Sequence, residues 1–459
     1  MPREYRQLSF WHASVPDTLK PRPALQGTHR ADVAIVGAGY TGLWTAWYLK
    51  QIDPSLDITV VESQLAGFGA SGRNGGWCSA YLSGIEHWLE QPAKKESAVR
   101  LQRLMFETVG EIGDFARQQG IDCHFESSGA LEVAVIPAQL QRLREELDHL
   151  RGFGFDDSDY EWIDGNRVHD FLRVENAAAA IHMKHCAAIH PCRLVRGLAL
   201  AVERQGVHVH ELSPVLRIED NEVHTAQGTV KAQSVILATE GYGAGMQHSA
   251  RRLVPVHSMM VATEPLSPEQ LECVGSHKRY CFGNLDHLVT YGQLTADQRL
   301  AFGCRGGYHF GSAVRSFDPA ASRFDIVRDT LKKFFPGLEG VRFSHAWGGA
   351  MGVTRSVRPV VSFDIERQQG WAGGYFGNGV GASHLAGKTL ADLVMGRDTE
   401  RTRTPWVNPE DASRRWEPEP LRWLGIHSRA LLMQLADRAE HGNRRSAAVY
   451  RKILGALYP

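Results

Sequence analysis

Residues 31–63 read ADVAIVGAGYTGLWTAWYLKQIDPSLDITVVES, and this stretch decides the fold. Residues 33–36 form a short apolar run with β-branched side chains, which predicts a buried strand. The amphipathic pattern that begins at Leu43 predicts a helix, and Asp53-Pro54 predicts its end. Residues 58–61 (ITVV) predict a second strand. Strand, helix and strand in this order indicate a βαβ unit at residues 32–62, and therefore an α/β fold with a Rossmann-like domain.

Three glycines follow the first strand at G-x-G-x-x-G spacing. Gly37 permits a tight turn, Gly39 lets the backbone approach a pyrophosphate, and Gly42 lets the helix pack closely on the strand. The N–H groups and the dipole at the helix start then favour phosphate. Glu62 lies at the end of the second strand, where its carboxylate accepts hydrogen bonds from ribose hydroxyls and disfavours the extra phosphate of NADP. Further candidates in the same stretch are Tyr40, Thr41 and Ser63.

Two more glycine-rich stretches distinguish FAD from NAD. Residues 67–76 (GFGASGRNGG) directly follow the second strand, and so many glycines leave mostly backbone to line a flat group. Residues 371–383 (WAGGYFGNGVGAS) lead into a helix, whose positive end can face the flavin C2 carbonyl. A nicotinamide enzyme has little use for this second helix start, so the sequence favours FAD. The candidates for binding FAD here are Ala70, Ser71, Arg73, Asn74, Gly75, Gly76, Gly374, Gly377, Asn378, Gly379 and Val380.

Two other segments are predicted to return to the same crevice. Residues 206–211, followed by 213–215, alternate like a strand, and residues 234–241 predict a buried strand that ends in small residues. Ligands of such sheets lie at the carboxyl ends of the strands, which makes Val215, Ala238 and Thr239 candidates for the cofactor site. Any buried strand of an α/β sheet would look similar, so an ordinary structural role remains an alternative.

The composition points to an ordinary globular enzyme. The 51 basic and 51 acidic side chains cancel, which gives no electrostatic reason to expect nucleic acid as a partner. No apolar run is long enough for a membrane span or a secretory signal. None of the seven cysteines form a C-x-x-C pair, and no H-E-x-x-H occurs, so we expect reduced thiols, a cytoplasmic protein and no metal site.

Four motifs together resemble the D-amino-acid oxidase (DAO) superfamily, most closely its γ-glutamylputrescine oxidase and glycine/sarcosine oxidase-like branch. They are ADVAIVGAGYTGLWTAWYL, GFGASGRNGG, HPCRLVRGLA (190–199) and GGYFGNGVGASHLAGKTLADL. With residues 347–361 (WGGAMGVTRSVRPVV) between them, the likeness covers roughly residues 8–398.

The resemblance implies a Rossmann-like FAD-binding domain of the glutathione-reductase type and a discontinuous α+β substrate domain built on an antiparallel sheet. The FAD domain is expected at 31–95, 186–248 and 345–400, and the substrate domain at 96–185 and 249–344. Residues 1–30 are expected to form an N-terminal arm and residues 401–459 a helical extension. Residues 129–135, 259–263 and 300–303 are strand-like, and residues 97–118 and 138–152 have helical periodicity. Two helices of the tail, about 426–440 and 444–457, are expected to pack on the FAD domain. A dimer contact or a membrane-surface helix is the alternative, although the mixed charges argue against a membrane.

The departures from the family pattern concern the loop before the last helix. Sarcosine oxidases carry a histidine and then a substrate-binding lysine there, whereas this loop has Asn378 and Gly381. This favours an amine over a free amino acid as substrate. Sarcosine oxidases also attach flavin to a cysteine ahead of the loop, but residues 345–376 contain none. We therefore expect non-covalent FAD.

The resemblance implies oxidation of a C–N bond of an amine or amino-acid derivative to an imine, by hydride transfer to flavin N5, with O2 reoxidising the flavin to give H2O2. A dehydrogenase that uses another acceptor, or a non-catalytic flavin-binding subunit, remains an alternative, and the oligomeric state is open. Asn378 is the first candidate for the substrate face. The other candidates, each with an ordinary structural role as the alternative, are Tyr291, Gln293, Tyr308, His345 and Trp347; His257, His309 and Cys78 are weaker.

Overall fold

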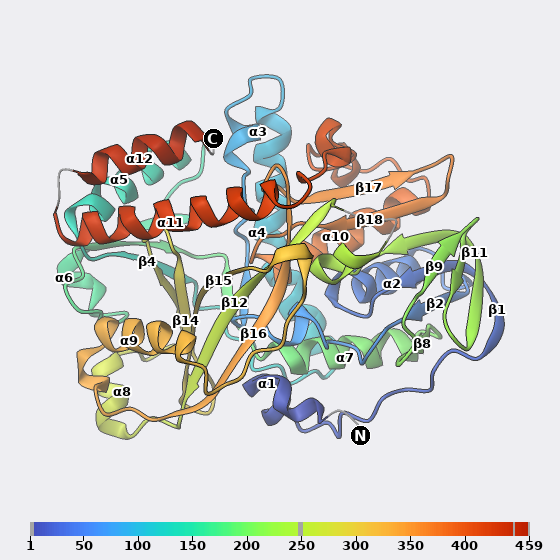
Figure 1. Cartoon of the computed structure of the whole chain (residues 1–459), viewed down its shortest axis with the longest axis horizontal. Coiled ribbons are helices and arrows are strands. Elements are labelled where there is room, and N and C mark those ends of the chain that lie inside the picture. The colour runs from blue at the N-terminus through green and yellow to red at the C-terminus, as the bar shows by residue number, and fades with distance from the viewer. Residues whose placement is uncertain (1–3, 247–250, 444–445, 458–459) are drawn as a thin grey trace.

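The computed structural model describes residues 4–246, 251–443 and 446–457. Two eight-stranded sheets organise this part of the chain, and Figure 1 shows one on each side of the molecule. The predicted α/β class with a second, antiparallel sheet is therefore confirmed.

The first sheet is built around the predicted βαβ unit. β1 (Gly27–Val36) runs parallel to β2 (Ile58–Val61), and α2 (Tyr40–Ile52) connects them. β1 begins six residues earlier than the apolar run predicted. The first residues of β1 are exposed, but they pair with β11 (Gly228–Leu237) and so continue the strand. The parallel pairing of β1 with β11 confirms that the 234–241 segment returns to the nucleotide-type crevice.

The strand order of this sheet is β17-β18-β11-β1-β2-β8, with the β9–β10 hairpin paired to β11. Of the predicted 206–215 segment only β8 (His208–His210) is a strand, and residues 213–215 continue without one. α10 (Gly379–Val394) packs against α2 on this sheet. The remaining elements are α7 (Pro191–Arg204), β9 (Arg217–Glu219), β10 (Glu222–His224), β17 (Val360–Asp364) and β18 (Gln369–Gly373).

The second sheet has the order β16-β12-β15-β14-β13-β4-β6-β5 and is antiparallel except where β13 meets β4. Its apolar side forms a core with rings such as Phe282, Phe302 and Phe334. Its strands are β4 (Ala130–Ala134), β5 (Tyr160–Asp164), β6 (Ala179–Met183), β12 (Leu253–Thr263), β13 (Cys281–Asn284), β14 (Thr290–Leu294), β15 (Leu300–Tyr308) and β16 (Phe343–Thr354).

The predicted helices at 97–118 and 138–152 are α4 (Lys95–Gln118) and α5 (Pro137–Gly152). The shorter elements of the described chain include α1 (Phe10–Ser14), β3 (Trp77–Ser79), α3 (Glu86–Leu89), α6 (Gly165–Val168), β7 (Cys186–Ala188), α8 (Pro268–Val274) and α9 (Asp325–Phe334). The domain boundaries inferred from the sequence remain a proposal. One of them, at residue 345, falls inside β16, which pairs with β12 of the second sheet.

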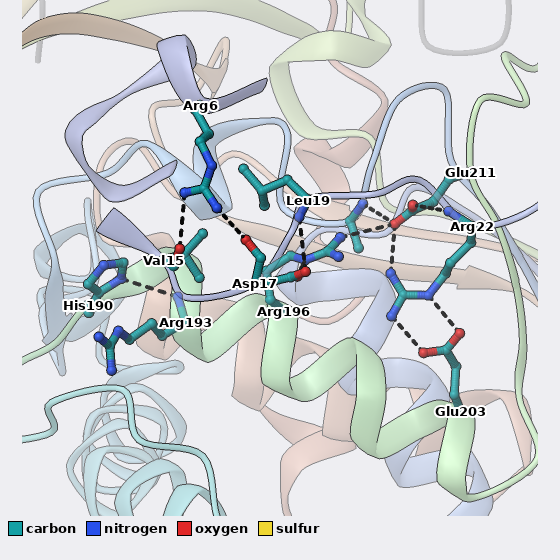
Figure 2. A network of polar contacts seen from close by, with 11 residues as sticks. Arg6, Val15, Asp17, Leu19, Arg22, His190, Arg193, Arg196, Glu203 and Glu211 are labelled. Carbon is teal, nitrogen blue, oxygen red and sulfur yellow. Dashed lines mark hydrogen bonds and ion pairs between the residues drawn. The ribbon is translucent and has the colours of Figure 1, made fainter. Parts of the chain in front are cut away.

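The N-terminal arm is attached to the first sheet by buried ion pairs, which Figure 2 shows. The Arg22 guanidinium contacts Glu203 of α7 at 2.6 Å and Glu211, just after β8, at 2.8 Å. Arg196 of α7 contacts Asp17 at 2.6 Å and the same Glu211 at 3.3 Å. The Glu211 side chain is 0% exposed, so the two guanidinium groups and the backbone N–H groups of Arg22 and Ala66 take the place of water around it.

The C-terminal helices are α11 (Leu421–His441) and α12 (Ser446–Leu457); residues 444–445 of the predicted second helix and residues 458–459 lie outside the described residues. The pair is expected to pack on the FAD domain, but α11 runs along the second sheet and contacts β15 (Figure 1). Asp437 of α11 accepts the backbone N–H groups of His287 and Leu288, in the turn between β13 and β14. None of the described helices is both long and apolar enough to cross a membrane.

Candidate cofactor and substrate site

A cavity of about 560 Å³ lies where the two sheets meet. One part of its wall comes from the carboxyl ends of β1, β2 and β11 and from the starts of α2 and α10, and the opposite part comes from β4, β12, β13, β14 and β15. The predicted cofactor residues that line it are Gly37, Gly39, Tyr40, Thr41, Glu62, Ser63, Ala70, Ser71, Arg73, Asn74, Gly75, Val215, Ala238, Thr239, Gly377, Asn378, Gly379 and Val380.

The first glycine turn has no space for side chains. Gly37 has a φ of +109°, and a Cβ there would lie 2.6 Å from the carbonyl oxygen of Ala238. A Cβ on Gly42 would lie 2.1 Å from the carbonyl oxygen of Gly37, so this glycine contacts the turn and does not line the cavity. The start of α2 therefore packs closely on the strand ends and presents mostly backbone to the cavity.

Glu62 lines the cavity, and its carboxylate oxygens already accept three hydrogen bonds from neighbouring residues. Its Oε2 accepts the N–H of Ala38 at 2.9 Å, and its Oε1 accepts from the Ser63 hydroxyl and the Gln64 N–H, both at 3.0 Å. Burial raises the pKa of this carboxyl, and the two backbone donors oppose that shift. An ionised carboxylate has about four acceptor positions, so one position is left for a ligand hydroxyl.

The second glycine-rich stretch is fastened from the other sheet by Gln293. Its buried Nε2 donates to the carbonyl oxygens of Gly75 and Gly76 at 3.0 Å and of Ile189 at 3.1 Å. Gln293 therefore does not face substrate, and Gly76 does not line the cavity. The neighbouring Tyr291 does line it, and a Cβ on Gly75 would lie 2.8 Å from the Tyr291 ring.

Replacement of Gln293 by leucine is expected to loosen this stretch, because the carbonyl groups of Gly75 and Ile189 would lose this donor, whereas that of Gly76 keeps the N–H of Ile189 at 2.8 Å. A lost buried hydrogen bond costs about 1–3 kcal/mol, so we expect a lower free energy of unfolding and roughly tenfold weaker FAD binding. Urea denaturation and FAD titration of the apoprotein would measure both. The exposed Gln141 of α5 gives a matched control, since Gln141→Leu should change neither. Unaltered FAD affinity in Gln293→Leu would contradict this role.

The third glycine-rich stretch leads into α10. Asn378 is the residue before this helix, and its side chain donates to the Ser83 hydroxyl at 3.1 Å instead of capping the helix. The first N–H groups of an α-helix have no partner within the helix, and here they adjoin the cavity through Gly379 and Val380. Gly374 lies outside the cavity wall, and its N–H donates to the half-buried Glu240 at 2.8 Å.

Three further predicted substrate residues lie away from the cavity, which corrects the sequence-based assignment. Trp347 donates from Nε1 to the carbonyl oxygen of Arg73 at 2.9 Å and is buried. His345 packs against Phe10 of α1 with ring centroids 5.5 Å apart. The Tyr308 hydroxyl donates to Glu419 at 2.5 Å and so fastens the C-terminal extension. The weaker candidates His257, His309 and Cys78 are also absent from the described cavity wall.

Two charged residues of the second sheet line the cavity although the sequence reasoning had passed over them. Arg305 of β15 stands in LAFGCRGGY, and Glu132 of β4 stands in ALEVA. Burial raises the pKa of Glu132. Each of these strands contains one charged residue among uncharged ones. This pattern in the sequence could have identified Glu132 and Arg305, because a charged residue is rarely buried without a partner or a function.

The comparisons with known proteins agree with this architecture. Residues 32–393 match the family model described as DAO: FAD dependent oxidoreductase. The chain is 33% identical to the γ-glutamylputrescine oxidoreductase of Escherichia coli K12 over 86% of this chain and 90% of that protein. It is 22% identical to a glycine oxidase of Bacillus licheniformis over 84% and 98%. The crystal structure of glycine oxidase from Geobacillus kaustophilus superposes with a TM-score of 0.68 at 21% identity, over 81% of this chain and 96% of that one.

The fold and the site define a flavoprotein of the oxidoreductase class. More specifically, the chain belongs to the DAO family of FAD-dependent oxidoreductases.

Proposed function

We propose that this protein binds FAD non-covalently in the cavity and oxidises the C–N bond of an amine or amino-acid derivative to an imine, with O2 as the final acceptor and H2O2 as a product. One observation carries the proposal. A single cavity joins the glycine turn after β1, the start of α10 and the substrate-side strands of the second sheet. The names of the relatives, an oxidoreductase of γ-glutamylputrescine and an oxidase of glycine, support an amine-type substrate.

The residues of the first sheet fit an adenine dinucleotide. The narrow turn at Gly37 and the start of α2 would receive the pyrophosphate, and Glu62 would accept from a ribose hydroxyl. The part of the glycine-rich stretch that lines the cavity, residues 70–75, is held by Gln293 and would lie along the ring system. Non-covalent binding is proposed because residues 345–376 contain no cysteine.

When bound, the flavin would supply the redox chemistry as the acceptor of a hydride from the carbon next to the substrate nitrogen. The protein then has to bind and orient the amine and exclude water. The Tyr291 ring lies against Gly75 and meets the Trp77 ring edge to face, with centroids 6.3 Å apart, and these contacts hold it at the cavity wall. Burial keeps the pKa of the Tyr291 hydroxyl well above its usual range, so Tyr291 serves as a neutral hydrogen-bonding group and not as a base.

The direct test is anaerobic reduction of the flavin by a panel of amines and amino acids. Loss of the visible flavin absorbance with any of them supports the proposed function, and peroxide formation on admitting air identifies an oxidase. A flavin that is reduced anaerobically but yields no peroxide would replace the oxidase by a dehydrogenase. A flavin that no amine reduces would leave only a flavin-binding role.

Substitution of Glu62 by glutamine is expected to weaken FAD binding roughly 10- to 100-fold. A hydrogen bond to a charged group is worth about 1.5–3 kcal/mol, and the amide NH2 would also face the Ala38 or Gln64 donors. Titration of the apoprotein with FAD would measure the change. FMN, which lacks the adenosine ribose, serves as the control ligand because its weaker affinity should stay the same. Equal losses for FAD and FMN would contradict the ribose contact.

A further inference from the structure

Glu240, in the helical turn that follows β11, joins two segments that lie far apart in the sequence. Its Oε1 accepts the N–H groups of Gly374 at 2.8 Å and of Tyr375 at 3.2 Å, both in the loop between β18 and α10. Its Oε2 accepts the N–H of Gly352 in β16. The loop belongs to the first sheet and β16 to the second, so one carboxylate holds the two sides of the cavity together.

The backbone is strained at both ends of this contact. Glu240 has a φ of +47°, which is unfavourable for any residue with a Cβ. In the loop, Phe376 also has a φ of +47°, between Gly374 at +80° and Gly377 at +104°. Such conformations cost free energy at non-glycine residues and persist only where the surrounding contacts hold them. The three hydrogen bonds of Glu240 are contacts of this kind.

The loop that Glu240 holds determines the shape of the cavity near α10. Phe376 lines the cavity, and its ring reaches the second sheet, where Cζ of Arg305 lies 4.1 Å from the ring centroid. The hydroxyl groups of Tyr375 and of Thr41 in α2 hydrogen-bond at 3.0 Å. The position of the start of α10, relative both to α2 and to the second sheet, therefore depends on this loop.

The contact requires an ionised carboxylate. Burial raises the pKa of Glu240, and the N–H groups of Tyr375, Gly374 and Gly352 oppose that shift. A protonated carboxyl would present a donor where these groups need an acceptor. An amide of nearly the same shape is also unsuitable. Its single oxygen can accept from the loop or from β16, and its NH2 group would face the N–H on the other side.

We propose that Glu240 is a positioning residue for the flavin, because its carboxylate fixes the loop before α10 against β16 and so keeps the start of α10 and Phe376 in place at the cavity. This inference rests on the proposed function and assigns a role within that site. The start of α10 is the helix end expected to face the flavin ring, whereas Glu62 is expected to bind the adenosine ribose. Loss of Glu240 should therefore affect the part of the cofactor that FAD and FMN share.

The test measures the binding of FAD and of FMN by the apoproteins of the unsubstituted chain, Glu240→Gln and Gly352→Ala, with quenching of flavin fluorescence as the readout. Gly352 does not line the cavity, but a Cβ there would lie 2.0 Å from Oε2 of Glu240 and would push the carboxylate away from β16. Each substitution is expected to weaken FAD and FMN binding by the same factor, roughly tenfold, because each breaks buried hydrogen bonds. The combined variant should bind no more weakly than either single variant, since both break one contact.

The spectrum of the bound flavin gives a second readout that a general loss of stability would not change. The visible bands should shift in Glu240→Gln, because the N–H groups at the start of α10 would lie in a different place. They should stay in place in Glu62→Gln, which is expected to weaken FAD binding alone. Glu366→Gln is the matched control, because Glu366 lies in the exposed turn between β17 and β18, and it should change neither affinity nor spectrum.

Several results would overturn the proposal. They are unchanged flavin affinities in both variants, a loss confined to FAD, and a combined loss equal to the product of the two single losses. If Glu240→Gln does not fold, Gly352→Ala alone decides, through its affinities for FAD and FMN. An unsubstituted protein that binds neither flavin would contradict the proposed function itself, and this role of Glu240 with it.

Discussion

Replacement of Glu211 by glutamine is expected to lower the free energy of unfolding by about 3–5 kcal/mol, because it removes one partner from a buried ion network. Oε1 of Glu211 accepts from the Ala66 N–H at 2.7 Å, from Arg22 at 2.8 Å and from Arg196 at 3.3 Å, while Oε2 accepts the Arg22 N–H at 2.7 Å. A glutamine has only one accepting oxygen, so donors on one side would lose their partner. The side chains of Arg22 and Arg196, only 11% and 8% exposed, would also lose charge compensation.

The effect should extend from the N-terminal arm to the cofactor site. Ala66 directly precedes the glycine-rich stretch that lines the cavity, and Glu211 holds its N–H. Urea denaturation with and without FAD would measure the loss of stability. Glu219→Gln is the matched control, since its pair with Arg217 spans 3.7 Å with both side chains more than half exposed, and such a pair contributes about 0–1 kcal/mol. Similar effects of both substitutions would show that the network does not hold the arm.

Replacement of Gly37 by alanine is expected to abolish FAD binding at micromolar cofactor and to destabilise the protein. The new Cβ would lie 2.6 Å from the carbonyl oxygen and 3.0 Å from the carbonyl carbon of Ala238, both backbone atoms that cannot move aside easily. The φ of +109° is also unfavourable for any residue with a Cβ. Backbone strain of this kind costs about 1–3 kcal/mol, and overpacking adds about as much again.

FAD titration and thermal unfolding of Gly37→Ala would measure both effects. Gly110→Ala is the control, because Gly110 lies within α4 and a Cβ there meets nothing within 4 Å. That substitution should leave FAD binding unchanged and add up to about 1 kcal/mol of stability. A Gly37→Ala protein that binds FAD normally would contradict the close approach of β1 and β11 at this turn.

The sequence was informative where local chemistry determines structure. The glycine spacing after residue 36 predicted the turn, and alternation or apolar runs predicted the strands of the βαβ unit and some others, among them β4, β11, β12 and β15. Gly42 was predicted to let the helix pack closely on the strand. It contacts the turn at Gly37 and does not line the cavity. These features depend on neighbours within a few residues along the chain.

The substrate side was predicted less well, because the side chains there are brought together by strand register over long distances. Tyr291 and Gln293 are two residues apart in one strand, yet Tyr291 lines the cavity and Gln293 binds three carbonyl groups beside it. The roles of Trp347 and Tyr308 depend on Arg73 and on Glu419, which are distant in sequence. The same limitation hid Arg305 of β15, because only the pairing of distant strands brings this residue into the cavity wall.

The central claim is that the turn at residues 37–42 and the carboxylate of Glu62 hold FAD, and the visible spectrum of the purified protein tests it most directly. We expect flavin bands, including one near ~450 nm, either as isolated or after incubation with FAD and removal of the excess. Heat or acid should then release the flavin into the supernatant, as expected for a non-covalent cofactor. A protein that remains colourless after incubation with FAD would contradict the account.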